Sequence, residues 1–416
     1  MKLIIVVFLT VGTAIGQCAE THTNLVEALT LEQAFELAEH RQPELAEARA
    51  LIEAAAGRAE QAGKFPNPDG IAKIEQAPFN GRTLGEAQYL AGIAQPVPLG
   101  GRLSKAREAE TLERDRRASE LEVRRRELHR RVHSAFATAL YQEQAFQSQM
   151  KIAESTEKAV TMAKARADAG DALPEDVARA EMELARAKVE LRRSASLREQ
   201  ALFALSAAIG DPSLSVRSLA GELEAAFEIL TLESLAADLS ANPTAVAADA
   251  AVRVESARVD LARAQRIPDV KVEVLYRRLQ AEKENTFDVG LSIPLPLFDR
   301  NQGRLREARA DLQAAEARSL ATRNDLTLRL REAHSQLTSA LATSRALRTE
   351  ILPRADTVLK AAEARYAAGD ASLNDVLPVR RDWAAVRLSY LESLRDAMQA
   401  WAEVAGYLKS PVVVVR

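Results

Sequence analysis

His129 and His133 are the side chains whose chemistry and spacing best suit a metal site. Residues four positions apart share one face of an α-helix, so the two imidazoles could bind one cation. Glu127 stands at no helical spacing that would supply a third ligand, and the charges of Arg130 and Arg131 would repel a cation. We therefore predict no metal site here, and no cofactor.

No motif of a known catalytic class is present in the 416 residues: there is no nucleophile elbow, P-loop, dinucleotide-binding loop or zinc-protease motif. The single cysteine excludes a disulfide framework and any site built from several cysteines. With 56 Lys and Arg against 59 Asp and Glu, the chain lacks the basic excess of a nucleic-acid-binding protein. The arginine-rich run 124–131 lies among glutamates, so we expect a solvated helix face with i,i+4 ion pairs. The sequence thus predicts neither an enzyme nor a nucleic-acid partner.

The first residues have the pattern of a secretory signal peptide, which we place at residues 1–19. Lys2 precedes an apolar run, 3–16, that is too short to span a bilayer. A signal peptidase could cut after Gly16 or after Ala19; a buried helix or an uncleaved anchor is the alternative. Downstream, no stretch reaches the roughly 18 apolar residues of a transmembrane helix. We expect an exported protein that is periplasmic, secreted or inserted into a membrane as strands.

Cys18 lies at the end of this segment and is a possible lipidation site, as the first residue of the mature chain. A small residue usually precedes a lipidated cysteine, whereas Gln17 stands there in this chain. We therefore expect Cys18 to be discarded or left unmodified.

The rest of the chain is an internal duplication with an offset of about 200 residues. The matching pairs are Thr30-Leu31-Glu32 with Thr231-Leu232-Glu233, Gln42-Pro43 with Asn242-Pro243, Pro68-Asp69 with Pro268-Asp269, and AGDALPEDV at 169–177 with AGDASLNDV at 368–376. Such ordered matches at one offset indicate two copies of a supersecondary unit. We place the first repeat at 20–220 and the second at 221–416.

Each repeat follows one plan, and the fold class is mainly α with a small β part. We predict first helices at 31–63 and 231–265, β-hairpins at about 70–97 and 269–296, long helices at 102–168 and 301–367, and return helices at 174–209 and 372–408. Each long helix would span about 100 Å, and Pro353 should kink the second. Apolar residues seven apart on the return helices are typical of coiled coils.

The hairpins alternate apolar and polar residues, as strands with two different faces do. The apolar face would hold Phe287, Val289, Leu291 and Ile293, with Tyr89 and Ile93 from the first repeat, and the polar face Lys271, Glu273, Asp288 and Ser292. If the apolar face meets lipid, the sheet must close into a barrel. Four strands are too few to do so, since barrels need about eight, so several copies must share one. The alternative is a periplasmic coiled-coil scaffold with a small soluble sheet.

Three segments resemble the TolC family of outer membrane efflux proteins. They are LTLEQAFELAEHRQPEL at 29–45, SIPLPLFDRNQGR at 292–304 and RYAAGDASLNDVL at 365–377. The QPVPLGGR segment at 95–102 and the compact hairpins are most similar to the CzcC/CusC branch of heavy-metal efflux. The resemblance implies a homotrimer with a shared twelve-stranded β-barrel in the outer membrane and an α-barrel across the periplasm. It also implies a periplasmic adaptor, an inner-membrane pump of the resistance–nodulation–division type, and a role as the exit duct for a substrate such as heavy-metal cations.

The resemblance assigns roles to the two helix-to-helix turns. The adaptor would contact Gly170, Asp171, Ala172 and Leu173 in the first turn and Gly369, Asp370, Ala371 and Ser372 in the second. Asp176 and Asp375 would line the periplasmic aperture. This chain departs from the TolC pattern at two positions, since Pro378 replaces a second gate aspartate and Ala371 replaces an arginine.

Overall fold

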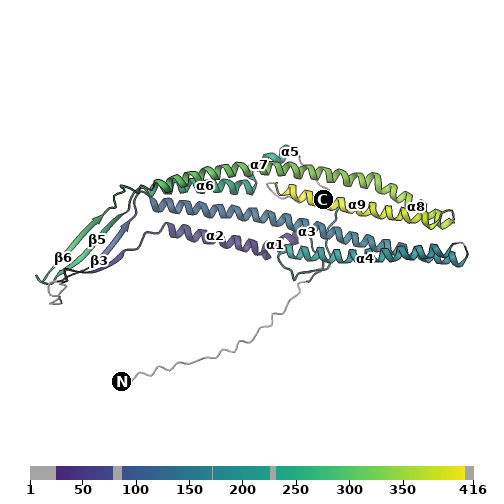
Figure 1. The fold of residues 1–416 in the computed structure, drawn as a ribbon, viewed down its shortest axis with the longest axis horizontal. Coiled ribbons are helices and arrows are strands. Elements are labelled where there is room, and N and C mark those ends of the chain that lie inside the picture. The colour runs from purple at the N-terminus through teal and green to yellow at the C-terminus, as the bar shows by residue number, and fades with distance from the viewer. Residues whose placement is uncertain (1–24, 78–86, 171, 225–230, 408–416) are drawn as a thin grey trace, which may run out of the picture.

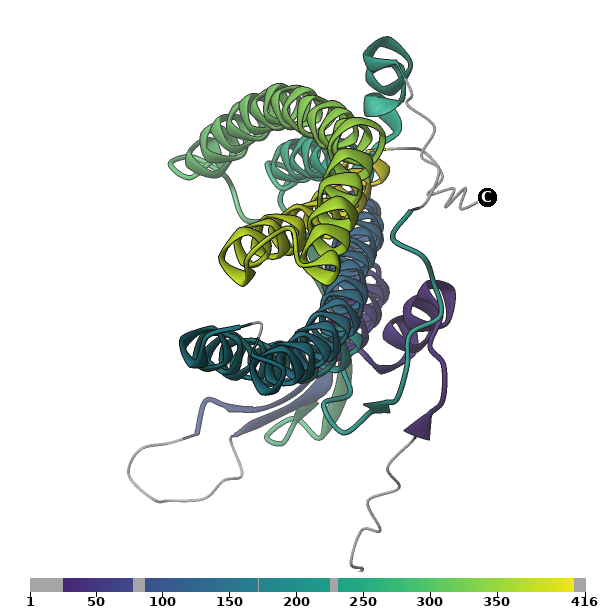
Figure 2. The same cartoon turned by 90° about the vertical axis from the view of Figure 1, so that its right-hand side faces the viewer.

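A computed structural model describes residues 25–77, 87–170, 172–224 and 231–407. The predicted signal peptide, Cys18 and Asp171 lie outside these ranges. The chain is elongated, with a β-sheet at one end and two helix-to-helix turns at the other (Figure 1). Seen end-on, the long helices follow an arc that is open on one side (Figure 2). Among the helices described, none combines the length and apolar content that a membrane-spanning helix needs.

The first repeat folds as the local sequence signals dictate. Its elements are α1 (Leu31–Arg41), α2 (Pro43–Ala62), β2 (Asp69–Glu75), β3 (Gln88–Val97), α3 (Arg102–Asp168) and α4 (Pro174–Ile209). Thr30 and Gln33 form a capping box that begins α1. Pro43 occupies the first turn of α2, where its missing N–H costs nothing. The predicted bounds of the long helix and its return helix are confirmed.

The second repeat has the same order of elements. They are α5 (Leu232–Asp238), a 3₁₀ turn (Leu239–Ala241), α6 (Pro243–Ala264), β5 (Val270–Leu279), β6 (Glu284–Ser292), α7 (Gln302–Ala346), α8 (Leu352–Ala368) and α9 (Leu373–Ala405). Asn242 caps α6 by accepting a hydrogen bond from the N–H of Thr244 (2.9 Å). Ile293, predicted within the last strand, lies just beyond β6.

The second long helix is interrupted just before Pro353, as we predicted from the position of this proline. A π-helical turn, Leu347–Ile351, separates α7 from α8. Proline lacks a backbone N–H and its ring collides with the carbonyl four residues earlier, so the regular α-helical ladder cannot continue there. The widened turn accommodates Pro353 while α8 continues toward the helix turn.

The two hairpins join into one antiparallel sheet with the strand order β2-β3-β5-β6, so β2 and β6 are its edges. β3 and β5 pair from Gln88 opposite Leu279 to Val97 opposite Val270. The prediction of four strands missed a second, small sheet. In it, β1 (Leu25–Val26) pairs in parallel with β4 (Ser215–Val216). Strands of two residues are too short to leave a periodic signal in the sequence.

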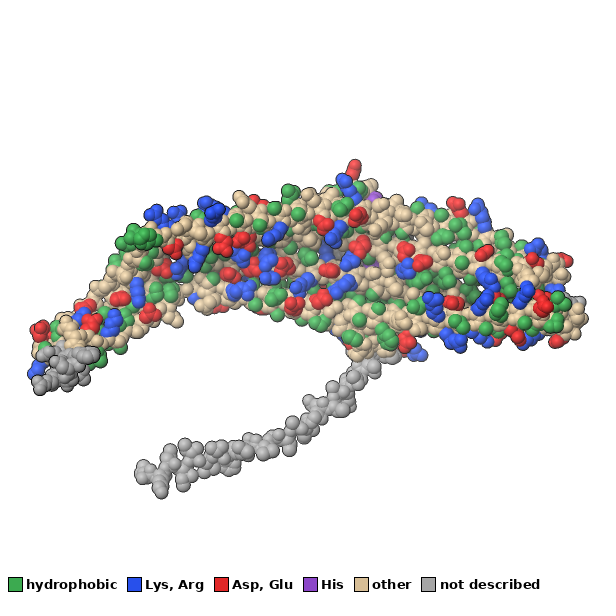
Figure 3. Space-filling view, viewed as in Figure 1, with side chains coloured by type: hydrophobic (Ala, Val, Ile, Leu, Met, Phe, Trp, Pro, Cys, Tyr) green, Lys and Arg blue, Asp and Glu red, His purple; other side chains and the backbone are tan. Residues whose placement is uncertain are grey.

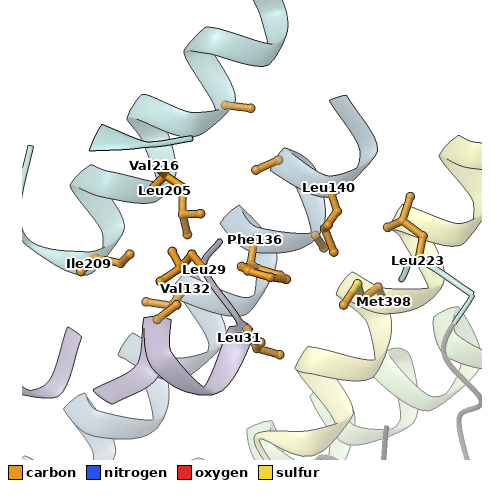
Figure 4. Close-up of a cluster of buried hydrophobic side chains, with 14 of the residues drawn as sticks. Leu29, Leu31, Val132, Phe136, Leu140, Leu205, Ile209, Val216, Leu223 and Met398 are labelled. Atoms are coloured by element: carbon orange, nitrogen blue, oxygen red, sulfur yellow. The ribbon is translucent and has the colours of Figure 1, made fainter. Parts of the chain in front are cut away.

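The largest hydrophobic cluster lies midway along the molecule, where α1, α3, α4 and α9 meet (Figure 4). Phe136 and Val132 of α3 pack there beside Leu205 and Ile209 of α4, and all four are almost fully buried. A second cluster near the helix turns contains Val160, Ala163, Tyr366 and Val376. These two clusters hold the helices together in the middle of the helical part and at its turn end.

Candidate functional site

The sheet has one apolar face and one polar face. The pairing sets Val274 of β5 opposite both Ile93 of β3 and Val289 of β6, so the three side chains share a face. Phe287 and Leu291 lie on the same face, and Phe287, Val289 and Leu291 are 75%, 77% and 68% exposed. Tyr89 also belongs to this face by register. A contiguous exposed apolar surface of this kind marks an interaction site.

The opposite face carries charges that pair across the strands. Arg277 contacts Asp288 (2.6 Å) and Glu75 (3.3 Å). Lys271 lies 3.7 Å from both Asp69 and Glu273. The register sets Lys271 opposite Ser292 and Leu275 opposite Asp288, so the predicted polar residues share one face. This face suits contact with water.

Gly92 occupies the joint between the two hairpins. It pairs with Leu275 in the β3–β5 ladder. A Cβ atom at this position would lie 2.1 Å from the carbonyl oxygen of Val274 and 2.7 Å from the Cα of Leu275. The backbones therefore approach so closely that only glycine fits. The sequence signals this role only by a glycine inside a strand pattern, and the role was therefore not predicted.

At the far end, the structure brings the two predicted turns together. They border a hollow of about 360 Å³ that Ala172 and Asp176 line from one turn and Gly369, Ala371 and Asp375 from the other. Gly170 and Gly369 adopt left-handed φ angles of 85° and 88°. A Cβ at Gly170 would meet no atom within 4 Å, so the turn conformation alone favours glycine there.

Three polar contacts tie the turns of the two repeats together. Arg166 of α3 donates to the carbonyl of Tyr366 (2.9 Å), and its guanidinium lies over that ring. Arg179 of α4 donates to the side-chain oxygen of Asn374, and Arg381 of α9 forms an ion pair with Glu183 of α4. Because each contact joins residues about 200 positions apart, none could be predicted from local spacing.

Asp375 also caps a helix. One carboxylate oxygen accepts hydrogen bonds from the backbone N–H (2.9 Å) and the hydroxyl (2.7 Å) of Ser372, at the start of α9. These hydrogen bonds hold the pKa of Asp375 below its usual range. The carboxylate is thus ionised at neutral pH, and it is fully exposed beside the hollow.

The two histidines of α3 are separately engaged. His129 stacks on Phe35 and its Nε2 lies 2.8 Å from Glu39. His133 is 5% exposed, and its Nε2 has no hydrogen-bond partner. Burial lowers the pKa of His133 to about 4, so the ring is neutral at neutral pH. Within the described ranges, no group of three His, Cys, Asp or Glu side chains could hold a metal ion.

The arginine-rich run on α3 agrees only in part with its prediction as a solvated face with i,i+4 pairs, since Arg125 pairs with Glu122 of the same helix at i,i+3 (2.9 Å). Arg124 pairs with Glu47 (2.9 Å) and Arg131 with Glu44 (2.5 Å), both on α2. Arg130 pairs with Glu403 of α9 (2.6 Å). The prediction was wrong for these three pairs because α3 packs between α2 and α9, whose acidic side chains lie within reach of its arginines.

An open sheet with an apolar face, continued by helices about 100 Å long that follow an arc, defines a subunit of a membrane-anchored tubular channel. The chain belongs to the outer membrane efflux protein family, whose family model matches residues 34–211 and 236–408. It is an efflux channel of the outer membrane that extends into the periplasm.

Comparison with individual proteins agrees with this assignment. The chain is 29% identical over 403 residues to the cobalt-zinc-cadmium resistance protein CzcC of Cupriavidus metallidurans, covering 95% of each. It is 30% identical to the nickel and cobalt resistance protein CnrC of the same organism, over 69% of this chain and 68% of that relative. The crystal structure of CusC superposes with a TM-score of 0.73 at 17% identity, covering 94% of this chain and 95% of that one.

These findings confirm the predicted fold class, the TolC-family membership and the outer membrane channel. They give no support to the scaffold alternative. The family's role is transport, carried out together with an adaptor and an inner-membrane pump.

Proposed function

We propose that the channel is a homotrimer that passively conducts divalent heavy-metal cations out of the cell. The proposed substrate class rests on the similarity to CzcC, which extends along 95% of both chains. CzcC and CnrC are named for resistance to cobalt, zinc, cadmium and nickel. The pump would be of the resistance–nodulation–division type and would select the substrate before it enters the channel.

Metal tolerance tests this function. A strain lacking the gene should stop growing at lower cobalt, zinc or cadmium concentrations than the parent strain, while its sensitivity to hydrophobic antibiotics stays unchanged. A plasmid copy should restore tolerance. A deletion that leaves metal tolerance intact but sensitises the cell to antibiotics would contradict the proposed metal substrate. It would indicate that the protein is a drug efflux channel.

The open edges of the sheet support the trimer. Among the described strands, β2 and β6 each leave one side unpaired, and a strand edge cannot face lipid without a partner. Three copies would supply twelve strands and would close the arc of helices into a ring (Figure 2). Mass measurement in mild detergent should therefore give three times the mass of the mature chain. A monomer or dimer under these conditions would contradict the proposal.

The helix turns would dock the adaptor, and substitutions there should separate docking from assembly. Ala371→Trp places a bulky ring on the exposed turn without disturbing the hydrophobic clusters. We expect it to abolish metal export while trimer mass and outer-membrane delivery stay normal, because the turn lies far from the sheet (Figure 1). Crosslinking from position 371 to the adaptor should succeed in the otherwise unchanged channel; its failure would leave the turn with a purely structural role.

The aperture role of Asp375 needs a control for its capping role. Asp375→Asn removes the charge, whereas Ser372→Ala weakens the same cap by about 1 kcal/mol and keeps the charge. If Asp375 lines the aperture, only Asp375→Asn should change single-channel conductance. Equal changes in both variants would assign the effect to the cap.

A further inference from the structure

The exposed apolar stripe of β6 continues beyond the end of the strand. Its members at alternate positions are Phe287, Val289, Leu291, Ile293, Leu295 and Leu297. The last three belong to the linker between β6 and α7, in which Pro294 and Pro296 favour an extended backbone. Leu295 is 75% exposed and Phe298, at the end of the linker, 91%. Figure 3 shows hydrophobic side chains gathered where the sheet meets α7.

The linker supplies length that the strand lacks. On β6 alone, the stripe from Phe287 to Leu291 covers about 14 Å along the chain, well short of the apolar band of about 25 Å on outer membrane barrels. Continued to Leu295, it covers about 27 Å, or about 21 Å along the membrane normal at a strand tilt of about 40°. A hydrogen bond from the N–H of Leu297 to the carbonyl of Leu295 (2.8 Å) then forms a tight turn in the linker. Phe298 follows this turn, at the end of the apolar stripe.

A basic groove begins where the apolar stripe ends. Arg266, at the end of α6, and Arg306 and Arg309, on the first turns of α7, line a hollow of about 490 Å³. None of these three arginines forms a salt bridge with a described residue, whereas Arg263 and Arg323 on the same two helices pair with Asp260 and Asp249.

Gln302 connects the groove to the linker. Its side chain lines the groove. It also donates a hydrogen bond to the carbonyl of Phe298 (3.2 Å) and accepts one from the N–H of Arg300 (2.7 Å). One side chain therefore borders the basic groove and also hydrogen-bonds to the linker that carries the end of the apolar stripe.

We propose that the stripe and the groove together bind a phospholipid of the periplasmic leaflet of the outer membrane. Its acyl chains lie along Leu295, Leu297 and Phe298, and its phosphate lies among the three arginines, whose guanidinium groups suit phosphate oxygens. This inference rests on the proposed orientation of the apolar sheet face toward lipid. The order of apolar stripe, aromatic ring and basic groove along the chain matches that of hydrocarbon, interface and headgroup in a bilayer leaflet.

Native mass spectrometry of the full-length channel in detergent tests the headgroup contact with added phosphatidylglycerol. Arg306→Gln with Arg309→Gln should reduce bound lipid roughly tenfold or more, since two basic contacts to an anionic headgroup are lost. The matched control is Arg331→Gln with Arg345→Gln, two exposed arginines farther along α7, which should bind lipid normally. Equal binding by both variants would overturn the proposal. Displacement of the lipid by an equal concentration of inorganic phosphate would also overturn it, by showing an anion site only.

A nitroxide label tests the apolar contact. In a Cys18→Ser background reconstituted in bilayers, a label at Leu297→Cys should be accessible to oxygen and protected from a water-soluble nickel chelate. A label at Leu320→Cys, an exposed site on α7, should show the reverse. Protection of position 297 from both reagents would show that a neighbouring protomer covers it and would overturn the proposal. Nickel access at Val289→Cys would instead contradict the barrel orientation in the proposed function.

Discussion

Replacing Gly92 with alanine should leave little or no assembled channel in the outer membrane. The added Cβ would lie 2.1 Å from the carbonyl oxygen of Val274 and 2.7 Å from the Cα of Leu275. Both are backbone atoms of β5, so the clash is relieved only if the β3–β5 ladder opens. The ladder holds the two repeats in one sheet, and an isolated two-stranded hairpin is at best marginally stable. Quantifying the detergent-extracted protein in the outer membrane fraction measures the effect.

Two other glycines of the sheet provide matched controls. A Cβ at Gly70 would meet no atom within 4 Å, and one at Gly290 would make an ordinary contact of 3.7 Å with the Cβ of Glu273. Gly70→Ala and Gly290→Ala should therefore assemble like the wild type. If Gly92→Ala accumulates to the same level as these controls, the pairing of β3 with β5 is incorrect.

The helical part of the fold could be predicted because its limits are encoded locally. Residues 102–172 contain no proline, and α3 runs over 67 of them. Pro174 and Gly210 mark the two ends of α4, the proline at its first turn and the glycine in the left-handed conformation after its last. The strand faces could be predicted as well, because a period of two in the sequence fixes which side chains share a face.

The contacts between the repeats could not be predicted in this way. Arg381 and Glu183 are 198 positions apart, and nothing in the spacing of either indicates the other. The same holds for Gly92 and Leu275, whose pairing depends on how the hairpins meet in space. The arginines of α3 show the consequence most clearly. Their charges suggested pairs within one helix, while packing between α2 and α9 offered acidic partners that the sequence could not reveal.

Replacing Val289 with arginine should reduce channel assembly by an amount that reports directly on lipid contact. Val289 is 77% exposed, so its replacement removes little packing within the chain. The cost arises only if the position faces hydrocarbon, where an arginine near the bilayer midplane costs about 2–4 kcal/mol. Every copy in the assembly carries the same substitution. We expect a several-fold loss of protein from the outer membrane fraction and a lower melting temperature of the channel in lipid.

The polar face supplies the control, because Ser292→Arg adds the same side chain on the opposite side of β6. Ser292 lies opposite Lys271, whose ammonium group is itself close to Asp69 and Glu273, so a second cation there remains near acidic groups and water. Ser292→Arg should therefore assemble nearly normally. The reverse result would mean that the two faces are interchanged, since a shift of one residue moves every side chain of a strand to the other face. Normal assembly of both variants would mean that neither face meets lipid, which is the behaviour that a sheet in water would show and a barrel wall would not.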